Sequence, residues 1–554
     1  MKFGRSRFTA FAFIAALGST GITNGAAFAQ PSNQGPAREV VAAACDSMKS
    51  TGSRRASDFS RIPDAPTQID EATVVEANGK DPEYCRLRGY VAPQVGIELR
   101  LPVNNWNGKL LEVGTGGWAG YMFMFLCDGP LRKGYACIST DMGHKDGSGQ
   151  ALWAFNNLQA QVDYGFRATH VTALAGKAIV AAFYKRAPVK SLMLGCSTGG
   201  YQGIVESQLF PWDFDGIVAI APDMTSEADV SMRIVWYVRA FTNADGSPVF
   251  GPADLRLLHD AALAQCDMTD GVRDGIVGDP LGCQFDPTVV VCRAGKMTGC
   301  LTPKQVDAAK KIYGGPRNSK GEPISTRGVL PGSELEWGGF DDSYAPEFFR
   351  YGVYMMSRGP DWQMRDFDFD QDYKRLGLAA IYSDNNPDLR KFKTSGAKLL
   401  VAQGGNDTAE IPGAVFDYYD TVERTMGGAA ATKEFFRLFV VPGMKHCTAG
   451  DGAFAVDYLS YLERWVEMGQ PPEKLVGAHV NSKYLLDHSE EEERRKGNVW
   501  RAAFRLVYPL DPAIPVDFTR TFYPYPQIAK YKGSGDPNDA ANFVPTEPQL
   551  SKPP

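Results

Sequence analysis

The sequence lacks a block of basic residues, contains few histidines and has no long apolar run beyond its N-terminus. Among 554 residues there are 6 histidines, and the net charge is −6. Nucleic acid binds to clusters of Lys and Arg, and the sequence has no such cluster, so we expect no nucleic-acid partner. No later apolar run reaches the roughly 18 residues that a membrane helix needs, so we expect no membrane span.

The N-terminus has the pattern of an export signal. Basic residues precede a short apolar stretch at Phe8–Leu17, and Ala27-Phe28-Ala29 fits an A-x-A cleavage site. We therefore expect residues 1–29 to be a cleaved signal peptide, and a buried N-terminal helix is the alternative. No lipoprotein-type cysteine stands near the cleavage site, so the sequence predicts a protein that is secreted or periplasmic.

The ten cysteines are an even number, which in an exported protein favours disulfides over metal thiolates or free thiols. Sequence alone does not fix their connectivity. Local spacing suggests four pairs: Cys45–Cys85, Cys127–Cys137, Cys266–Cys283 and Cys292–Cys300. Cys196 and Cys447 remain, far apart in the sequence.

Strand-like and helix-like segments alternate from about residue 85 to 222, which predicts a mostly parallel sheet covered by helices. The alternation of strand-like and helix-like segments stops at Pro222, and residues 224–394 are rich in Gly, Asp, Pro and aromatic residues. Core-like strands resume at Ala397–Ala402. We therefore expect residues 224–394 to be an inserted lid domain, and residues 30–223 and 395–554 to form the main domain.

Gly195-Cys196-Ser197-Thr198-Gly199 fits G-x-S-x-G, the nucleophile elbow of α/β-hydrolases. An apolar strand-like run precedes it and a helix-like segment follows, which is the context that the motif requires. A Gly-rich turn without catalytic role is the alternative. The expected fold class is α/β, an α/β-hydrolase fold with a large inserted lid domain.

A serine hydroxyl needs a positioned base to become a nucleophile. His446 follows a late strand, as the histidine of such enzymes does, and Asp407 follows the strand before it. The order Ser197, Asp407, His446 matches the expected order of a catalytic triad. Asp407 could instead be a turn former, and His144 is a rival histidine that would break the order.

Two further features surround the predicted triad. If Ser197 and His446 meet, their neighbours Cys196 and Cys447 must be close, so a Cys196–Cys447 disulfide is expected; a nucleophilic Cys196 is the alternative. An oxyanion hole requires two backbone N–H groups. We assign these to Thr198 and to Gly117 in a Gly-rich loop, for which a flexible hairpin is the alternative.

The segment 266–276 places three carboxylates within eight residues, and hard cations bind such oxygen-rich loops. The spacing is not that of an EF-hand, because no glutamate occupies the twelfth position. We expect a structural Ca²⁺ ion with ligands from the carboxylates of Asp267, Asp270 and Asp274 and the carbonyls of Val272 and Ile276. A solvated acidic turn is the alternative.

Taken together, Gly195–Gly200, Asp407, His446-Cys447 and the acidic loop resemble the tannase/feruloyl esterase family. That family pairs its two catalytic-loop cysteines and carries a calcium site in its lid. The resemblance covers essentially the whole mature chain and implies a secreted serine carboxylesterase acting on small feruloyl- or galloyl-type aromatic esters.

The resemblance leaves alternatives for the function. One is a hydrolase of phthalate or terephthalate monoesters, for which Arg350, Arg358 and Arg365 are candidate carboxylate ligands. Another is a general lipase, which the absence of a long apolar lid helix disfavours. The non-enzyme alternative is a calcium-dependent binding protein on an inactive scaffold. Lid aromatics are candidates for an aromatic-ring pocket: Trp337, Phe340, Tyr344, Phe348, Phe349, Tyr351, Tyr354 and Trp362. The sequence does not indicate the oligomeric state.

Overall fold

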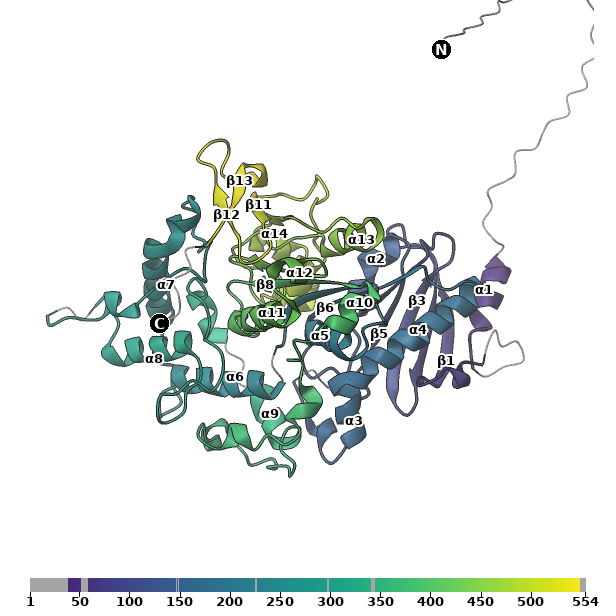
Figure 1. Cartoon of the computed structure of the whole chain (residues 1–554), viewed down its shortest axis with the longest axis horizontal. Helices are drawn as coiled ribbons and strands as arrows, with labels where there is room; N and C mark the ends of the chain where they lie inside the picture. The colour runs from purple at the N-terminus through teal and green to yellow at the C-terminus, as the bar shows by residue number, and fades with distance from the viewer. Residues whose placement is uncertain are drawn as a thin grey trace, which may run out of the picture.

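A computed structural model describes residues 38–50, 58–145, 147, 149–224, 227–295, 298–339 and 344–548. The expected signal peptide and Phe340 lie outside these residues. A nine-stranded sheet crosses the molecule, in the order β1-β2-β3-β5-β4-β6-β7-β8-β9 (Figure 1). Its strands are β1 (Thr67–Val75), β2 (Tyr84–Val91), β3 (Val95–Pro102), β4 (Lys109–Val113), β5 (Ala136–Thr140), β6 (Lys190–Ser197), β7 (Gly216–Pro222), β8 (Lys398–Gly404) and β9 (Phe436–Val441).

The sheet is parallel from β5 through β4 to β9 and antiparallel from β1 to β5. After β4 the chain continues to β5 on one side, whereas after β6 it continues to β7 on the other. Such a reversal opens a crevice between the carboxyl ends of β4 and β6, where α/β proteins bind ligands. The Gly-rich loop after β4 and Ser197 at the end of β6 therefore meet there.

Helices cover both faces of the sheet. The strands β6, β7 and β8 are almost fully buried, as a parallel sheet between helices requires. The helices of the main domain and tail are α1 (Arg38–Asp46), α2 (Asp128–Arg132), α3 (Leu158–Val162), α4 (Ala168–Tyr184), α5 (Thr198–Leu209), α10 (Arg390–Ser395), α11 (Pro412–Met426), α12 (Ala429–Lys433), α13 (Tyr458–Met468), α14 (Ser482–Asp487), α15 (Glu491–Arg495) and α16 (Trp500–Phe504).

A long insertion separates β7 from β8. It contains α6 (Glu227–Phe241), α7 (Pro252–Cys266), α8 (Pro303–Gly314) and α9 (Tyr344–Tyr351), which lie together beside the sheet (Figure 1). Helix α6 packs against both α8 and α9. This insertion is the lid domain of the α/β-hydrolase fold.

The C-terminal segment forms two small sheets. Strand β10 (Leu475–His479) pairs with β11 (Phe518–Phe522), and β12 (Ile528–Tyr531) pairs with β13 (Phe543–Thr546). Strand β12 also contacts the acidic loop of the lid. Strands β10 and β11 each bury three of their five residues, whereas β12 and β13 are mostly exposed or half-buried.

One expectation about the sheet needs correction: the sheet begins at Thr67, whereas the sequence indicates alternating segments only from about residue 85. A π-helical turn, Asp163–Arg167, where Gly165 packs against Ile381, lies between α3 and α4. Helix α13 begins at Tyr458, shortly after Ala455 pairs with Ala478 in a bridge.

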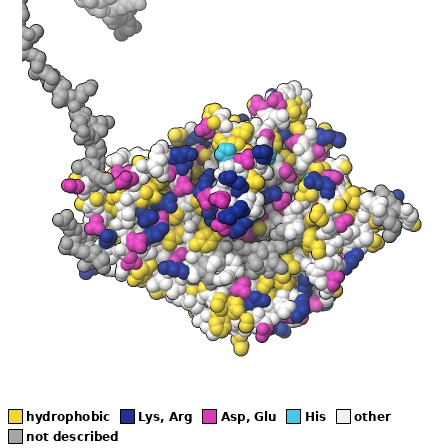
Figure 2. Space-filling model, turned by 180° about the vertical axis from the view of Figure 1, so that it is seen from behind, with side chains coloured by type: hydrophobic (Ala, Val, Ile, Leu, Met, Phe, Trp, Pro, Cys, Tyr) yellow, Lys and Arg dark blue, Asp and Glu magenta, His cyan; other side chains and the backbone are white. Residues whose placement is uncertain are grey.

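Acidic and basic side chains are interspersed over the face drawn in Figure 2, and hydrophobic side chains are scattered among them. Among the described helices, none combines the length and apolar character that crossing a membrane requires.

Candidate active site

Ser197 stands at a strained turn between β6 and α5. Its φ is 60° and its ψ is −127°, a backbone conformation that is uncommon for a residue with a side chain. Helix α5 begins at the next residue, so its amide-rich N-terminus lies beside the serine. A strained backbone of this kind at the serine is a feature of a nucleophile elbow.

The glycines of the motif are needed for close packing. A Cβ atom at Gly195 would lie 2.2 Å from the carbonyl oxygen of Gly199. A Cβ atom at Gly199 would lie 2.9 Å from the carbonyl oxygen of Thr115, and one at Gly114 would lie 2.5 Å from the Cα of Gly199. At these glycines the elbow and the loop after β4 therefore pack backbone against backbone, which leaves no room for a side chain.

Asp407 and His446 lie together on the loops that follow β8 and β9. The Nδ1 atom of His446 is 3.0 Å from Oδ2 of Asp407. The Asp407 side chain is fully buried, whereas 29% of the His446 side chain is exposed. The Oδ1 atom of Asp407 accepts hydrogen bonds of 2.9 Å from the amides of Ala409 and Glu410. The carboxylate is therefore fixed and orients an imidazole that solvent can reach.

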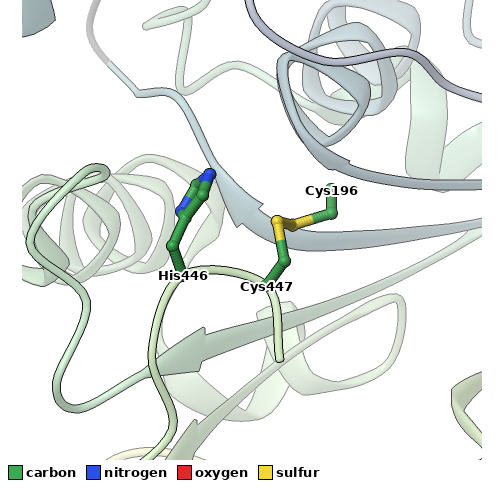
Figure 3. Close-up of side chains that lie close together, drawn as sticks. All are labelled: Cys196, His446 and Cys447. Carbon is green, nitrogen blue, oxygen red and sulfur yellow. A yellow bond between two sulfur atoms is a disulfide. The ribbon is translucent and has the colours of Figure 1, made fainter. Parts of the chain in front are cut away.

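A disulfide joins the elbow to the histidine loop. Cys196 and Cys447, separated by 251 residues, are bonded, and the bond lies beside the ring of His446 (Figure 3). The four locally spaced pairs are also disulfides, and no cysteine of the described chain is free. Ser197 and His446 are therefore each next in sequence to one cysteine of this disulfide. It also removes Cys196 as a free nucleophile.

Two residues that the sequence did not indicate support this pair. The amide of Gln403 donates to Oδ2 of Asp407 at 3.2 Å. Glu410 is nearly buried, and its negative charge acts on His446. Burial opposes the charged imidazole, but Asp407, through its charge and hydrogen bond, and Glu410 outweigh this effect. The pKa of His446 is therefore raised above its usual value.

The Gly-rich loop after β4 is fastened to the start of α5. The Thr198 hydroxyl donates to the carbonyl oxygen of Gly117 at 2.6 Å, and the Thr115 amide donates to the side chain of Gln202 at 2.9 Å. Gly117 has a φ of 59°. The backbone of Gly117 thus lies against Thr198, the two residues expected to form an oxyanion hole. Gln202, one turn into α5, was not evident from the sequence.

The rival histidine has another partner. The Nε2 atom of His144 lies 2.6 Å from the carbonyl oxygen of Trp118, and its ring stacks on Trp153. His144 therefore supports the loop that carries Gly117.

The lid contacts the loops of both Asp407 and His446. Lys445 forms an ion pair of 2.8 Å with Glu336, and Asn406 donates to the carbonyl oxygen of Gly332 at 2.8 Å. Both lid residues belong to the segment leading into and through the 3-10 helix Glu334–Gly339. The position of the lid is thus coupled to residues adjacent to the candidate triad.

Most of the lid aromatics are core residues rather than pocket residues. Trp337, Phe348 and Phe349 are fully buried, and Phe348 stacks on Trp118 with ring centroids 4.6 Å apart. Tyr354 and Trp362 are also buried, and Tyr351 is half-buried. The side chain of Tyr344 lies outside the described residues. The aromatic content of the lid therefore reflects its packing.

Two of the three candidate arginines are already engaged within the lid. Arg350 pairs with Glu347 at 3.0 Å and donates to the carbonyl oxygen of Trp362. Arg358 pairs with Asp372 at 3.2 Å and lies over the ring of Tyr354. Arg365 is exposed.

The acidic loop of the lid has oxygen atoms suited to a hard cation. Amides bind one carboxyl oxygen of each buried aspartate: Asp274 and Gly275 donate to Oδ1 of Asp267, and Val272 donates to Oδ1 of Asp270. The Ile276 amide donates to Asp274. The backbone of the loop therefore holds the carboxyl groups of all three aspartates within one short segment.

The charge of this loop also fits a cation. Burial, together with the negative charges of Asp274 and Asp267, raises the pKa of Asp270 to about 7. Arg520 of β11 lies 2.5 Å from the carboxylate of Asp274. Three carboxylates against the two guanidinium groups of Arg520 and Arg273 leave a net negative charge, which an oxygen-liganded divalent cation would neutralise.

Comparisons with known proteins agree with this geometry. A family model described as tannase and feruloyl esterase matches residues 79–545. The chain is similar to an uncharacterised esterase of Xanthomonas campestris pv. campestris, with 32% identity and 87% of each chain covered. It is also similar to mono(2-hydroxyethyl) terephthalate hydrolase of Piscinibacter sakaiensis, with 31% identity over 91% of this chain and 92% of that protein.

Solved structures show the same likeness. Feruloyl esterase B from Aspergillus oryzae superposes with a TM-score of 0.75 at 25% identity, covering 87% of this chain and 97% of that one. Tannin acyl hydrolase from Aspergillus niger has a TM-score of 0.64 at 20% identity, covering 87% and 90%, and supports the fold alone.

Proposed function

Because the chain belongs to the tannase and feruloyl esterase family and is a carboxylic ester hydrolase, we propose that it is a secreted serine esterase with Ser197, His446 and Asp407 as its triad. The observation that carries this proposal is the hydrogen bond between His446 and Asp407, on a loop bonded through Cys447 to the residue before Ser197. The strained backbone of Ser197 supports the same assignment.

The chemistry follows from these positions. His446 takes the proton of Ser197 as its oxygen attacks the ester carbonyl, and then gives that proton to the leaving alcohol. Asp407 holds the imidazole and stabilises its charge. The amides of Thr198 and Gly117 stabilise the oxyanion, and the N-terminus of α5 adds its dipole. Water, activated by His446, then hydrolyses the acyl-enzyme.

We propose feruloyl- and galloyl-type esters of aromatic acids as the substrate class. Relatives that are feruloyl esterases support this choice. Terephthalate monoesters are the second candidate, supported by the similarity to mono(2-hydroxyethyl) terephthalate hydrolase. A terephthalate carboxylate requires a cation, and Arg350 and Arg358 already have partners. Because two of the three candidate arginines are engaged and Arg365 is exposed to solvent, we favour acids without a second carboxylate.

A substrate panel tests this proposal. We expect kcat/KM for methyl ferulate or methyl gallate to exceed that for mono(2-hydroxyethyl) terephthalate. The opposite order would select the terephthalate monoester alternative. If no ester in the panel, nor a chromogenic short-chain ester, were hydrolysed, the binding-protein alternative would replace the enzyme.

The pH dependence of catalysis should report His446. Since the general base must be neutral, activity falls as pH drops through the pKa of the histidine. That pKa is raised, so the acid limb of kcat/KM should have its midpoint above about 6.5, the usual value. Asp407→Asn should lower kcat and also move the midpoint to lower pH, because the carboxylate that stabilises the imidazolium is lost.

Two esters with different leaving groups provide the control for this profile. The pH dependence of kcat/KM reports the free enzyme, so the midpoint of the acid limb should be the same for both esters. A wild-type midpoint below about 6.5, or one that Asp407→Asn leaves in place, would contradict the assigned pair.

We also propose that Ca²⁺ binds Asp267, Asp270 and Asp274 with the carbonyls of Val272 and Ile276, and that its role is structural. The loop lies between the disulfide Cys266–Cys283 and β11, to which Arg520 connects it. An ion there would tie the lid to the C-terminal sheets. It takes no part in the serine chemistry described above.

Chelation should therefore lower the melting temperature without an immediate loss of turnover. A ligand present at 100 times its Kd stabilises the folded state by about 2.7 kcal/mol. Asp270→Asn should melt like chelated wild type and respond no further to chelator. Asp307→Asn, which removes an exposed lid carboxylate on α8, should keep the full calcium response. Instant loss of turnover on chelation, with unchanged melting and rescue by zinc, would indicate a catalytic metal instead.

A further inference from the structure

A second cluster of metal-ligating side chains lies between α4, α5 and the sheet, at the other end of α5 from Ser197. His170 of α4, Glu206 of α5 and Asp213 of the following loop each offer a ligand atom, and these atoms lie within 4.8 Å of one another. The Nδ1 atom of His170 is 2.5 Å from Oδ2 of Asp213. The helices α4 and α5 are in contact beside the sheet (Figure 1).

Two carboxyl groups in this region are buried without a positively charged partner. Glu206 and Glu112 of β4 are fully buried. Within the described chain Glu112 has no hydrogen-bond partner, and Glu206 shares a side-chain hydrogen bond with another carboxyl group, that of Asp213. The charge of Glu112 acts on Glu206, and that of Asp213 acts on both. Buried polar atoms are normally satisfied by protein, water or an ion, so the two oxygens of Glu112 and the crowded carboxyl pair point to a missing partner.

The protein supplies little positive charge to this cluster. The nearest ammonium, Lys177, lies 3.8 Å from Asp213 and is partly exposed to solvent. One lysine faces three carboxyl groups. Burying carboxylates without compensating charge is costly, because the low-dielectric interior disfavours the ionised form.

We propose that His170, Glu206 and Asp213 bind a divalent transition-metal ion, with Glu112 as a neighbouring carboxylate outside the ligand set. One imidazole with two carboxylates suits zinc, whereas the all-oxygen loop of the lid suits calcium. The ion fixes the last turn of α5 to α4, and so steadies the helix whose first residue follows Ser197. It is a structural ion and does not depend on the proposed esterase activity.

Binding an ion requires the ligand side chains to readjust. Ligand atoms about 2.1 Å from zinc lie at most about 4.2 Å apart. The observed atoms lie within 4.8 Å of one another, so the widest pairs must draw together. Nδ1 of His170 and Oδ2 of Asp213, 2.5 Å apart, must exchange their hydrogen bond for bonds to the ion. The His170 side chain is 14% exposed, which gives the ion a route of entry. Cys196, His446 and Cys447 also cluster, but both of those sulfurs are consumed in a disulfide.

Zinc retention by the full chain tests this proposal. The protein is stripped with chelator, saturated with Ca²⁺ to fill the lid loop, equilibrated with Zn²⁺ and desalted, and its zinc is measured by mass spectrometry. Wild type and Asp270→Asn should retain one equivalent. Glu206→Gln and His170→Ala should lose it. His479→Ala, which removes another His–Asp pair with Asp517, should keep it.

Folding and protonation are controlled separately. If Glu206→Gln does not fold, His170→Ala decides the result, since its side chain reaches the surface. The competing state is a metal-free site with protonated carboxyls, because burial raises the pKa of Glu112 and Glu206. No zinc in wild type, or zinc retained by both variants, overturns the proposal. Loss of zinc in His170→Ala together with a zinc-dependent rise in wild-type melting temperature supports it.

Discussion

Replacing Ser197 with alanine should lower kcat by on the order of 10⁴-fold or more while the protein remains folded. The hydroxyl forms the covalent intermediate, and the remaining groups stabilise only the oxyanion. The turn at Ser197 has a positive φ in the wild type, and alanine meets the same backbone strain as serine, so the fold should be little affected. Steady-state kinetics and thermal melting, measured side by side, check both statements.

Ser247→Ala is a suitable control, because Ser247 is an exposed serine of the lid. It should retain wild-type kcat. A folded Ser197→Ala protein with kcat within a few-fold of wild type would show that Ser197 is not the nucleophile.

Removing the Cys196–Cys447 disulfide should cost both stability and catalysis. The bond closes a loop of 251 residues, and loss of a native disulfide costs about 2–5 kcal/mol. The double variant Cys196→Ala/Cys447→Ala also releases the histidine loop from the elbow. We therefore expect kcat to fall even at temperatures where the variant is folded.

The short disulfide Cys292–Cys300 is the matched control. Its sequence separation is 8, so the chain-entropy model predicts a loss smaller by about 3 kcal/mol. Its removal should leave kcat unchanged. Equal effects of the two double variants, on stability and on kcat, would show that the Cys196–Cys447 bond has no special role at the site.

The elements nearest the site were the most predictable from sequence. Strand β7 is a continuous apolar run, and β4 and β6 are mostly buried strands with apolar centres in the parallel part of the sheet. The elbow after β6 has the glycines that its backbone contacts require. The pairing of Cys196 with Cys447 also followed, because it depends only on two sequence neighbours of the candidate triad.

Other features depend on contacts that leave no local pattern. Gln202 and Gln403 are ordinary polar residues until tertiary structure places them on Thr115 and Asp407. In the sequence, the aromatic residues of the lid fit a ligand pocket and a hydrophobic core equally well. Only their burial in the structure shows that residues such as Phe348 belong to the core. The two small C-terminal sheets are short, so periodicity could not reveal them.

Labelling with a serine-directed fluorophosphonate, followed by peptide mapping, tests the central claim most directly. The reagent forms a covalent bond only with a serine that a base activates and an oxyanion hole supports. We predict a single adduct on Ser197, formed in step with the loss of ester hydrolysis, and none in His446→Ala. An active enzyme that remains unlabelled at Ser197, or one inactivated by an adduct at another residue, would contradict the account.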